Sequence, residues 1–163
     1  MQRNLDRKNN LMKKNISVLI RKAQKFDLKG LLGLWDNSGL AISDKKSEEE
    51  ELLRMVSLNP LSCFVAEYGE EIIGSVLGVF AGRRAWIYHL AIDPKFQKQG
   101  IGTKLLKSAE QALVKVGGHK LRLFVEFTNL KVIPFYEKNG YAVINDAILL
   151  GKNVIPGRIR RGN

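Results

Sequence analysis

Apolar residues occur along this chain with two different spacings, which predict strands and helices. Short β-rich stretches bounded by turn residues predict strands at Ile16–Arg21, Cys63–Tyr68, Glu71–Ala81, Trp86–Ile92, Leu121–Phe127 and Tyr141–Leu150. The second, third and fourth of these strands are separated only by residues 69–70 and 82–84. Connections that short predict an antiparallel meander.

Helical spacing, with apolar residues three or four positions apart, marks four further segments. Three of them begin after Asp27, Ser47 and Gly100, and the fourth covers Asn129–Asn139. Asp27 is the expected N-cap of the first helix. Ser47 and Glu50 match a capping box for the second helix. The resulting order is strand, two helices, three strands, helix, strand, helix, strand, which predicts a mixed α/β fold rather than a regular βαβ repeat.

Length and composition predict one domain with two basic ends. A chain of 163 residues that is 45% hydrophobic can bury a single core. We expect one domain at residues 15–155, a basic and weakly ordered extension at 1–14, and a basic tail at 156–163. Of the net charge of +11, residues 1–14 contribute +4 and residues 157–163 contribute +3, so the body carries +4. That charge suits a small anionic ligand at least as well as nucleic acid, which we do not expect to bind to the body.

The apolar and cysteine content predicts a cytoplasmic protein without a membrane partner. The apolar runs are shorter than the ~18 residues that a membrane span needs. No apolar region of a secretory signal follows the basic N-terminus. Cys63 is the single cysteine, which fits a reducing compartment and predicts a small core residue.

The stretch FQKQGIGTKLLK, residues 96–107, places two glycines between a predicted strand and a predicted helix. Backbone N–H groups can converge there at the positive end of the helix dipole, which suits a phosphate or pyrophosphate. The alternative is that the glycines only permit a tight turn. A Walker loop needs Lys where Thr103 stands, and a dinucleotide fingerprint needs Gly where Leu105 stands, so both nucleotide motifs are disfavoured.

Two segments resemble the GNAT superfamily of N-acetyltransferases. The run HLAIDPKFQKQGIGTKLLKSAEQAL, residues 89–113, resembles its coenzyme-A-binding motif, and Gln97, Gly100 and Gly102 match the signature positions. The run VEFTNLKVIPFYEKNGY, residues 125–141, resembles its second motif, and Asn129 and Tyr136 match at the family's spacing. With the strand order, the resemblance covers residues 16–150. Within the superfamily, the sequence is similar in particular to a bacterial and archaeal branch of small acetyltransferases whose substrates are undefined.

The resemblance implies acetyl-CoA as co-substrate and no metal. It implies that backbone amides around Gly100 hold the pyrophosphate, that the strand before them binds the pantetheine arm and thioester carbonyl, and that Asn129 meets that arm. Tyr136 corresponds to the residue that protonates the leaving thiolate. The implied cofactor-binding positions are Leu90, Ala91, Ile92, Gln97, Lys98, Gln99, Gly100, Ile101, Gly102, Thr103, Asn129 and Tyr136. Pro134 departs from a simple helix there, so the helix begins later, near Lys131, or is kinked.

The resemblance does not assign the base that takes the proton of the amine. Some relatives carry an acid five positions before the Asn, where Phe124 stands. Glu126 is the nearest carboxylate, although an ordinary solvent-facing Glu is at least as good a reading.

Strand alternation gives a second set of candidates. Tyr88 is expected on the same face as Trp86 and Leu90, where it can line the acceptor pocket or relay a proton through water. His89 is then expected on the opposite face, as a structural histidine.

These observations imply an acyltransferase that moves an acetyl group from acetyl-CoA to a primary amine by direct attack in a ternary complex. The acceptor is a small-molecule or peptide amine, and the sequence does not identify it. One alternative is a GNAT-like module that binds CoA without turnover. Another is a protein that docks on nucleic acid or ribosomes through its basic tails. Because members of the superfamily often pair, a homodimer is also compatible with the resemblance.

Overall fold

The computed structural model describes residues 17–40, 45–146 and 148–152. The expected basic extension at 1–14 and the basic tail at 156–163 therefore lie outside the described residues. The chain divides into two compact units, at residues 1–124 and 125–163.

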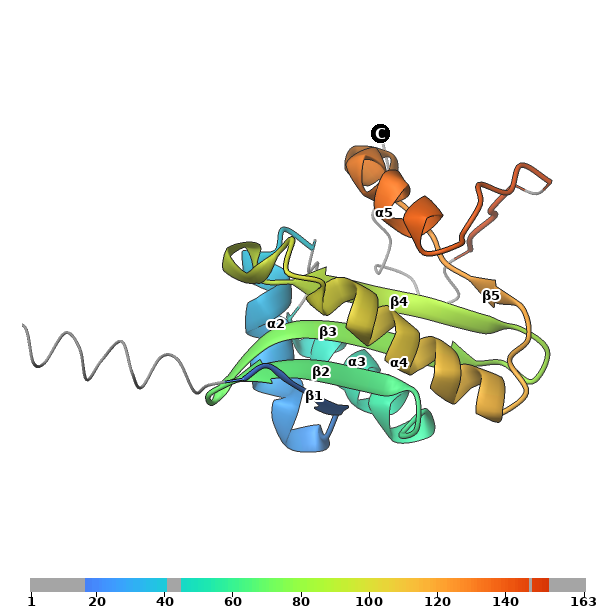
Figure 1. The fold of residues 1–163 in the computed structure, drawn as a ribbon. Coiled ribbons are helices and arrows are strands. Elements are labelled where there is room, and N and C mark those ends of the chain that lie inside the picture. The colour runs from blue at the N-terminus through green and yellow to red at the C-terminus, as the bar shows by residue number, and fades with distance from the viewer. Residues whose placement is uncertain (1–16, 41–44, 147, 153–163) are drawn as a thin grey trace, which may run out of the picture. The chain divides into compact units, whose positions relative to one another are not determined.

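The first unit is built on a five-stranded sheet in the order β1-β2-β3-β4-β5 (Figure 1). Neighbouring strands pair antiparallel from β1 to β4, which confirms the predicted meander, and β4 pairs parallel with β5. The strands are β1 (Leu19–Lys22), β2 (Cys63–Tyr68), β3 (Glu71–Phe80), β4 (Ala85–Ile92) and β5 (Leu121–Arg122). The fifth strand is five residues shorter than the predicted Leu121–Phe127.

Helices cover both faces of this sheet. Figure 1 shows α4 (Ile101–Lys115) on one face, and α2 (Leu28–Asn37) with α3 (Lys45–Leu58) on the other. On the α2/α3 face, Leu31 and Trp35 pack with Val65 and Leu77 in a buried core. On the α4 face, Gly78 lets helix and sheet approach, because a Cβ there would lie 3.1 Å from Leu113 Cδ1.

One predicted helix cap, Ser47, was wrong, and the other, Asp27, is at the N-cap position of α2 as predicted but makes no capping bond to that helix. The Asp27 carboxylate accepts two hydrogen bonds of 2.8 Å from Arg21 and one of 2.7 Å from the backbone N–H of Gln24. Asp27 is buried, and an ion pair satisfies its charge better than one amide would. Ser47 lies inside α3, which begins at Lys45, so it caps nothing.

The second unit contains a 3-10 helix at Phe127–Val132 followed by α5 (Ile133–Lys138). Pro134 therefore falls in the first turn of α5, where its missing N–H costs no helical bond. Of the two interpretations of Pro134, a later helix start and a kinked helix, the structure shows the later start, at Ile133.

The last predicted strand, Tyr141–Leu150, was wrong. None of its described residues is in a strand. An alternating apolar pattern supplies the side chains of a strand but not the neighbouring backbone that must pair with it. The mixed α/β class and the order of elements through α5 are nevertheless as predicted.

Candidate functional site

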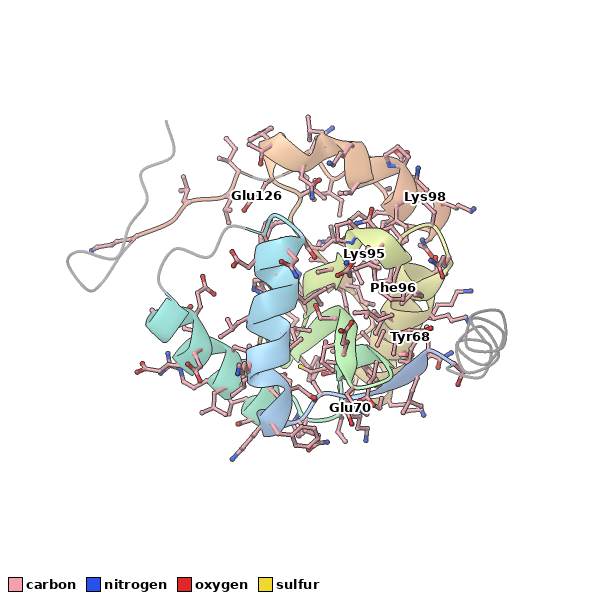
Figure 2. The ribbon with its side chains drawn as sticks, turned by 90° about the vertical axis from the view of Figure 1, so that its left-hand side faces the viewer. Tyr68, Glu70, Lys95, Phe96, Lys98 and Glu126 are labelled. Carbon is pink, nitrogen blue, oxygen red and sulfur yellow. The ribbon has the colours of Figure 1, made fainter. Side chains whose placement is uncertain are left out.

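The glycine segment lies in the connection between β4 and α4. A 3-10 helix at Pro94–Phe96 begins it, and Asp93 Oδ1 accepts a 2.8 Å hydrogen bond from the Lys95 N–H. Gln97 Nε2 donates a 3.1 Å hydrogen bond to the carbonyl oxygen of Ile92, which ties the loop to the end of β4. Figure 2 labels Lys95, Phe96 and Lys98 along this loop, whose Phe96 ring lies 5.2 Å from that of Tyr68. The side chain of Gln97 thus holds the loop in place.

The loop leads directly into the N-terminus of α4. Gly100, the residue before the helix, adopts the left-handed conformation with φ 79°, and Lys98 does so with φ 59°. The first intrahelical bond runs 3.1 Å from the Lys104 N–H to the Gly100 carbonyl. The amides of residues 101–103 therefore have no acceptor within their own helix. Together with the dipole of a 15-residue helix, they form an electropositive end suited to a phosphate.

Strand β4 carries a β-bulge next to this loop. Tyr88 pairs with Leu77 and Ala91 with Ser75, so two residues of β4, His89 and Leu90, stand opposite one residue of β3. His89 has φ 47°, in the left-handed region that non-glycine residues rarely adopt. The alternation assumed from the sequence is broken at this point.

The bulge corrects the predicted orientation of His89. Its ring stacks on Trp35 of α2, with centroids 4.1 Å apart and planes 17° apart. Tyr88 also packs against the core on the α2/α3 face. Consecutive residues therefore lie on the same side of the sheet, whereas His89 was expected on the opposite side. Burial lowers the pKa of His89 below its ordinary value.

A buried polar chain holds the bulge. Trp35 Nε1 donates a 3.0 Å hydrogen bond to Ser75 Oγ, which donates a 2.7 Å bond to the carbonyl oxygen of His89. Neither Trp35 nor Ser75 was singled out from the sequence as a site residue. The available signal was a hydroxyl in the middle of an apolar β3, since buried polar groups need partners.

Among the residues that the structure describes, the outer edge of β4 is paired only at its first two residues. There β5 pairs with Ala85 and Trp86. Within the described residues, no strand pairs with that edge at Leu90–Ile92, the predicted seat of the pantetheine arm. An unpaired strand edge offers backbone donors and acceptors to an extended ligand.

The remaining predicted residues belong to the second unit. Tyr136 is half-buried, packs edge-on against the rings of Phe135 at 5.2 Å and Tyr141 at 5.7 Å, and has its pKa raised by burial. Asn129 has a non-helical backbone (φ −125°, ψ 27°), and its N–H donates to the carbonyl of Glu126 at 2.8 Å. Glu126 is exposed, and its carboxylate accepts a 3.4 Å hydrogen bond from the hydroxyl of Thr128.

The predicted site residues are thus divided between the two units. The first unit contains the β4 bulge, its edge and the N-terminus of α4, and the second contains Glu126, Asn129 and Tyr136. Among the described residues, no group of three or more His, Cys, Asp or Glu side chains is placed to hold a metal ion. No described helix is long and apolar enough to cross a membrane.

Comparisons with known proteins agree with this architecture. The chain is 34% identical over 139 residues to an acetyltransferase of Pectobacterium atrosepticum, which covers 85% of this chain and 97% of the relative. It is 25% identical to the PaiA N-acetyltransferase of Thermoplasma acidophilum, solved in complex with coenzyme A. The TM-score is 0.68, with 81% of this chain and 94% of that chain covered.

A further structure, Ard1 of Thermoplasma volcanium, shares the fold with a TM-score of 0.70 at 21% identity, over 79% of this chain and 85% of that chain. The model of the acetyltransferase (GNAT) family matches residues 31–141. The match includes the β4 bulge, the glycine loop and Tyr136. This chain belongs to the GNAT family of acetyltransferases.

Proposed function

We propose that this protein transfers an acetyl group from acetyl-CoA to a primary amine by direct attack in a ternary complex. One observation carries the proposal: the unpaired edge of β4 is followed in the chain by the start of α4, whose first amides have no acceptor within the helix. An extended arm and a pyrophosphate fit those two features in turn.

In this proposal each predicted contact has a distinct task. The backbone from Lys98 to Thr103 holds the pyrophosphate, and the backbone of residues 90–92 binds the pantetheine arm and polarises the thioester carbonyl. Gln97 acts indirectly, since its amide already binds the Ile92 carbonyl and keeps the loop against β4. Asn129 is assigned to the pantetheine arm by its place in the family's second motif.

The chemistry needs alignment and proton transfer more than covalent help. The amine nitrogen attacks the thioester carbon, a C–N bond forms, the C–S bond breaks, and the thiolate is protonated. Tyr136 supplies that proton. A tyrosine phenol is protonated at neutral pH, the form a donor needs, and burial raises the pKa of Tyr136 further. This route requires no metal and no enzyme nucleophile, and the single cysteine, Cys63, fits a cytoplasmic setting.

Tyr88 lies on the α2/α3 side of the sheet and lines the acceptor side in this proposal. Glu126 is the carboxylate nearest in sequence to Asn129, and its exposure lets it exchange protons with water.

The test is a panel of amines assayed for thiol release from acetyl-CoA. The panel covers peptide N-termini, lysine, polyamines, amino acids and aminoglycosides, and reactions without amine give the hydrolytic background. Amine-dependent thiol release, with the acetylated amine found by mass spectrometry, supports the proposal. Thiol release that no amine increases contradicts it.

A further inference from the structure

The one imidazole in β4 belongs to His89, which none of the proposed contacts with acetyl-CoA uses. His89 sits at the bulge, and its carbonyl is held by Ser75 Oγ at 2.7 Å. Ser75 and Trp35 are both fully buried and hydrogen-bonded to each other. They therefore fix the backbone of His89 from the buried side of the strand. A residue in a rarely populated backbone conformation, held by a dedicated buried contact, indicates a functional position.

The stacking contact holds the ring by one face and leaves its edge outside that contact. The nearly parallel contact with Trp35, at 4.1 Å and 17°, uses one face of the imidazole. Ring nitrogens lie at the edge, outside that contact. Within the described chain, no side-chain nitrogen or oxygen is both buried and without a hydrogen-bond partner. The imidazole of His89 therefore does not end in the core with an unsatisfied nitrogen.

We propose that His89 is the proton acceptor for the amine in the acetyl transfer, an inference that rests on the proposed function. His89 directly precedes Leu90–Ile92, the backbone assigned to the thioester. The imidazole therefore projects from the same strand that would bind the thioester carbonyl. It also lies on the α2/α3 side of the sheet with Tyr88. The other candidate base, Glu126, is exposed, and among the described residues no ring contact or buried hydrogen bond holds its carboxylate in one position.

Protons balance in this scheme. A neutral ring nitrogen of His89 takes one proton from the ammonium form of the acceptor and passes it to solvent. The freed amine attacks the thioester carbon. As the C–S bond breaks, the nitrogen loses its second proton to solvent, the thiolate takes one from Tyr136, and Tyr136 regains its proton from solvent. The net reaction yields an amide, a thiol and one released proton.

Burial favours the form of the imidazole that this role needs. It lowers the pKa of His89, so the ring is neutral at pH 7 and able to accept a proton. The titratable residues on the elements around the ring are Tyr88 on β4, Lys29 and Asp36 on α2, and Glu71 on β3. Burial alone, rather than any of these groups, shifts the imidazole.

The test compares His89→Gln with His119→Gln, which changes the other histidine of the chain, an exposed residue after α4. We expect His89→Gln to lower kcat/KM at pH 7 by about 100-fold or more, the usual contribution of a general base. We also expect it to remove the acid limb of the pH profile while leaving CoA affinity within about threefold of wild type. His119→Gln is expected to keep both rate and profile.

A second measurement does not depend on the variant folding. With only two histidines, NMR titration of the wild-type protein resolves each imidazole, and the kinetic acid limb should follow that of His89. Equal rates and profiles in wild type and His89→Gln, or a kinetic limb that does not track His89, would overturn the inference. A wild-type protein that binds CoA but acetylates no amine overturns the proposed function as well, and so differs from a failure of His89 alone.

Discussion

Ser75 Oγ donates a 2.7 Å hydrogen bond to the carbonyl oxygen of His89 while accepting one of 3.0 Å from Trp35 Nε1. One hydroxyl in the middle of β3 thereby joins α2 to the bulge of β4. At the bulge, the carbonyl of His89 accepts its hydrogen bond from the Ser75 side chain instead of from the backbone of β3. The shape of the strand at the proposed reaction site thus depends on a residue that does not face the ligand.

Replacing Ser75 with Ala should destabilise the fold. Ser75 is fully buried, and its loss leaves the Trp35 N–H and the His89 carbonyl without a partner. We expect the free energy of unfolding to fall by about 1–3 kcal/mol, the usual cost of unsatisfied buried groups. Urea denaturation measures the change. Ser108→Ala is the control, because that hydroxyl only binds the Lys104 carbonyl of its own exposed helix turn. Equal stabilities of the two variants would contradict the account.

Two glycine substitutions should have opposite effects. A Cβ at Gly78 would lie 2.7 Å from the Ser62 carbonyl oxygen and 3.1 Å from Leu113 Cδ1. Gly78→Ala should therefore destabilise by about 1–3 kcal/mol through overpacking against Ser62 first and Leu113 of α4 second. Gly33→Ala, in exposed space on α2, meets no atom within 4 Å and should stabilise by about 0.5–1 kcal/mol through helix propensity. Thermal unfolding of both variants checks the sign, and a stabilising Gly78→Ala would refute the close packing.

Cys63 should resist thiol reagents in the native protein. It is fully buried, and burial raises the pKa of its thiol to about 12, so almost no thiolate is present near pH 8. We expect labelling by iodoacetamide to follow global unfolding and to become fast in concentrated urea, as mass spectrometry can follow. Rapid labelling of the folded protein would show that this core position opens locally.

Stability should decline below pH 6.5 because of His89. Its folded pKa is lowered by burial, so between that lowered value and the ordinary value of about 6.5 the unfolded chain binds more protons. The free energy of unfolding then rises with pH through this window and is flat above it as far as His89 is concerned. Denaturant curves from pH 5 to 8 should show this slope in wild type and in His119→Gln, and a smaller slope in His89→Gln. Parallel curves for wild type and His89→Gln would count against a buried, neutral imidazole.

The sequence predicted the first unit well because its pattern is local and dense. Strand β2 matches its predicted bounds, and β3 and β4 end or begin within one residue of theirs. The glycine loop and the start of α4 were also predicted, since Gly100 needs a positive φ that few residues adopt. These features follow from short-range periodicity and backbone sterics.

The bulge and the buried ion pair were not predictable in the same way. A one-residue insertion in β4 depends on its register with β3, so the faces of Tyr88 and His89 cannot be read by counting. Asp27 was expected to make a capping bond because the Arg21 that binds it lies on a separate strand. The strand expected at residues 141–150 failed for a related reason, because pairing requires a neighbouring backbone that one segment does not reveal.

The central claim is that the N-terminus of α4 binds the pyrophosphate of CoA, and calorimetry of CoA binding tests it most directly. Gly102→Glu puts a carboxylate in the first turn of α4, where an acidic residue favours the helix itself but repels the phosphate. Gln111→Glu, at an exposed position of the same helix, makes the same change in charge and serves as the control. The account predicts saturable CoA binding in wild type and Gln111→Glu and its loss in folded Gly102→Glu. Equal CoA affinity in all three proteins would contradict it.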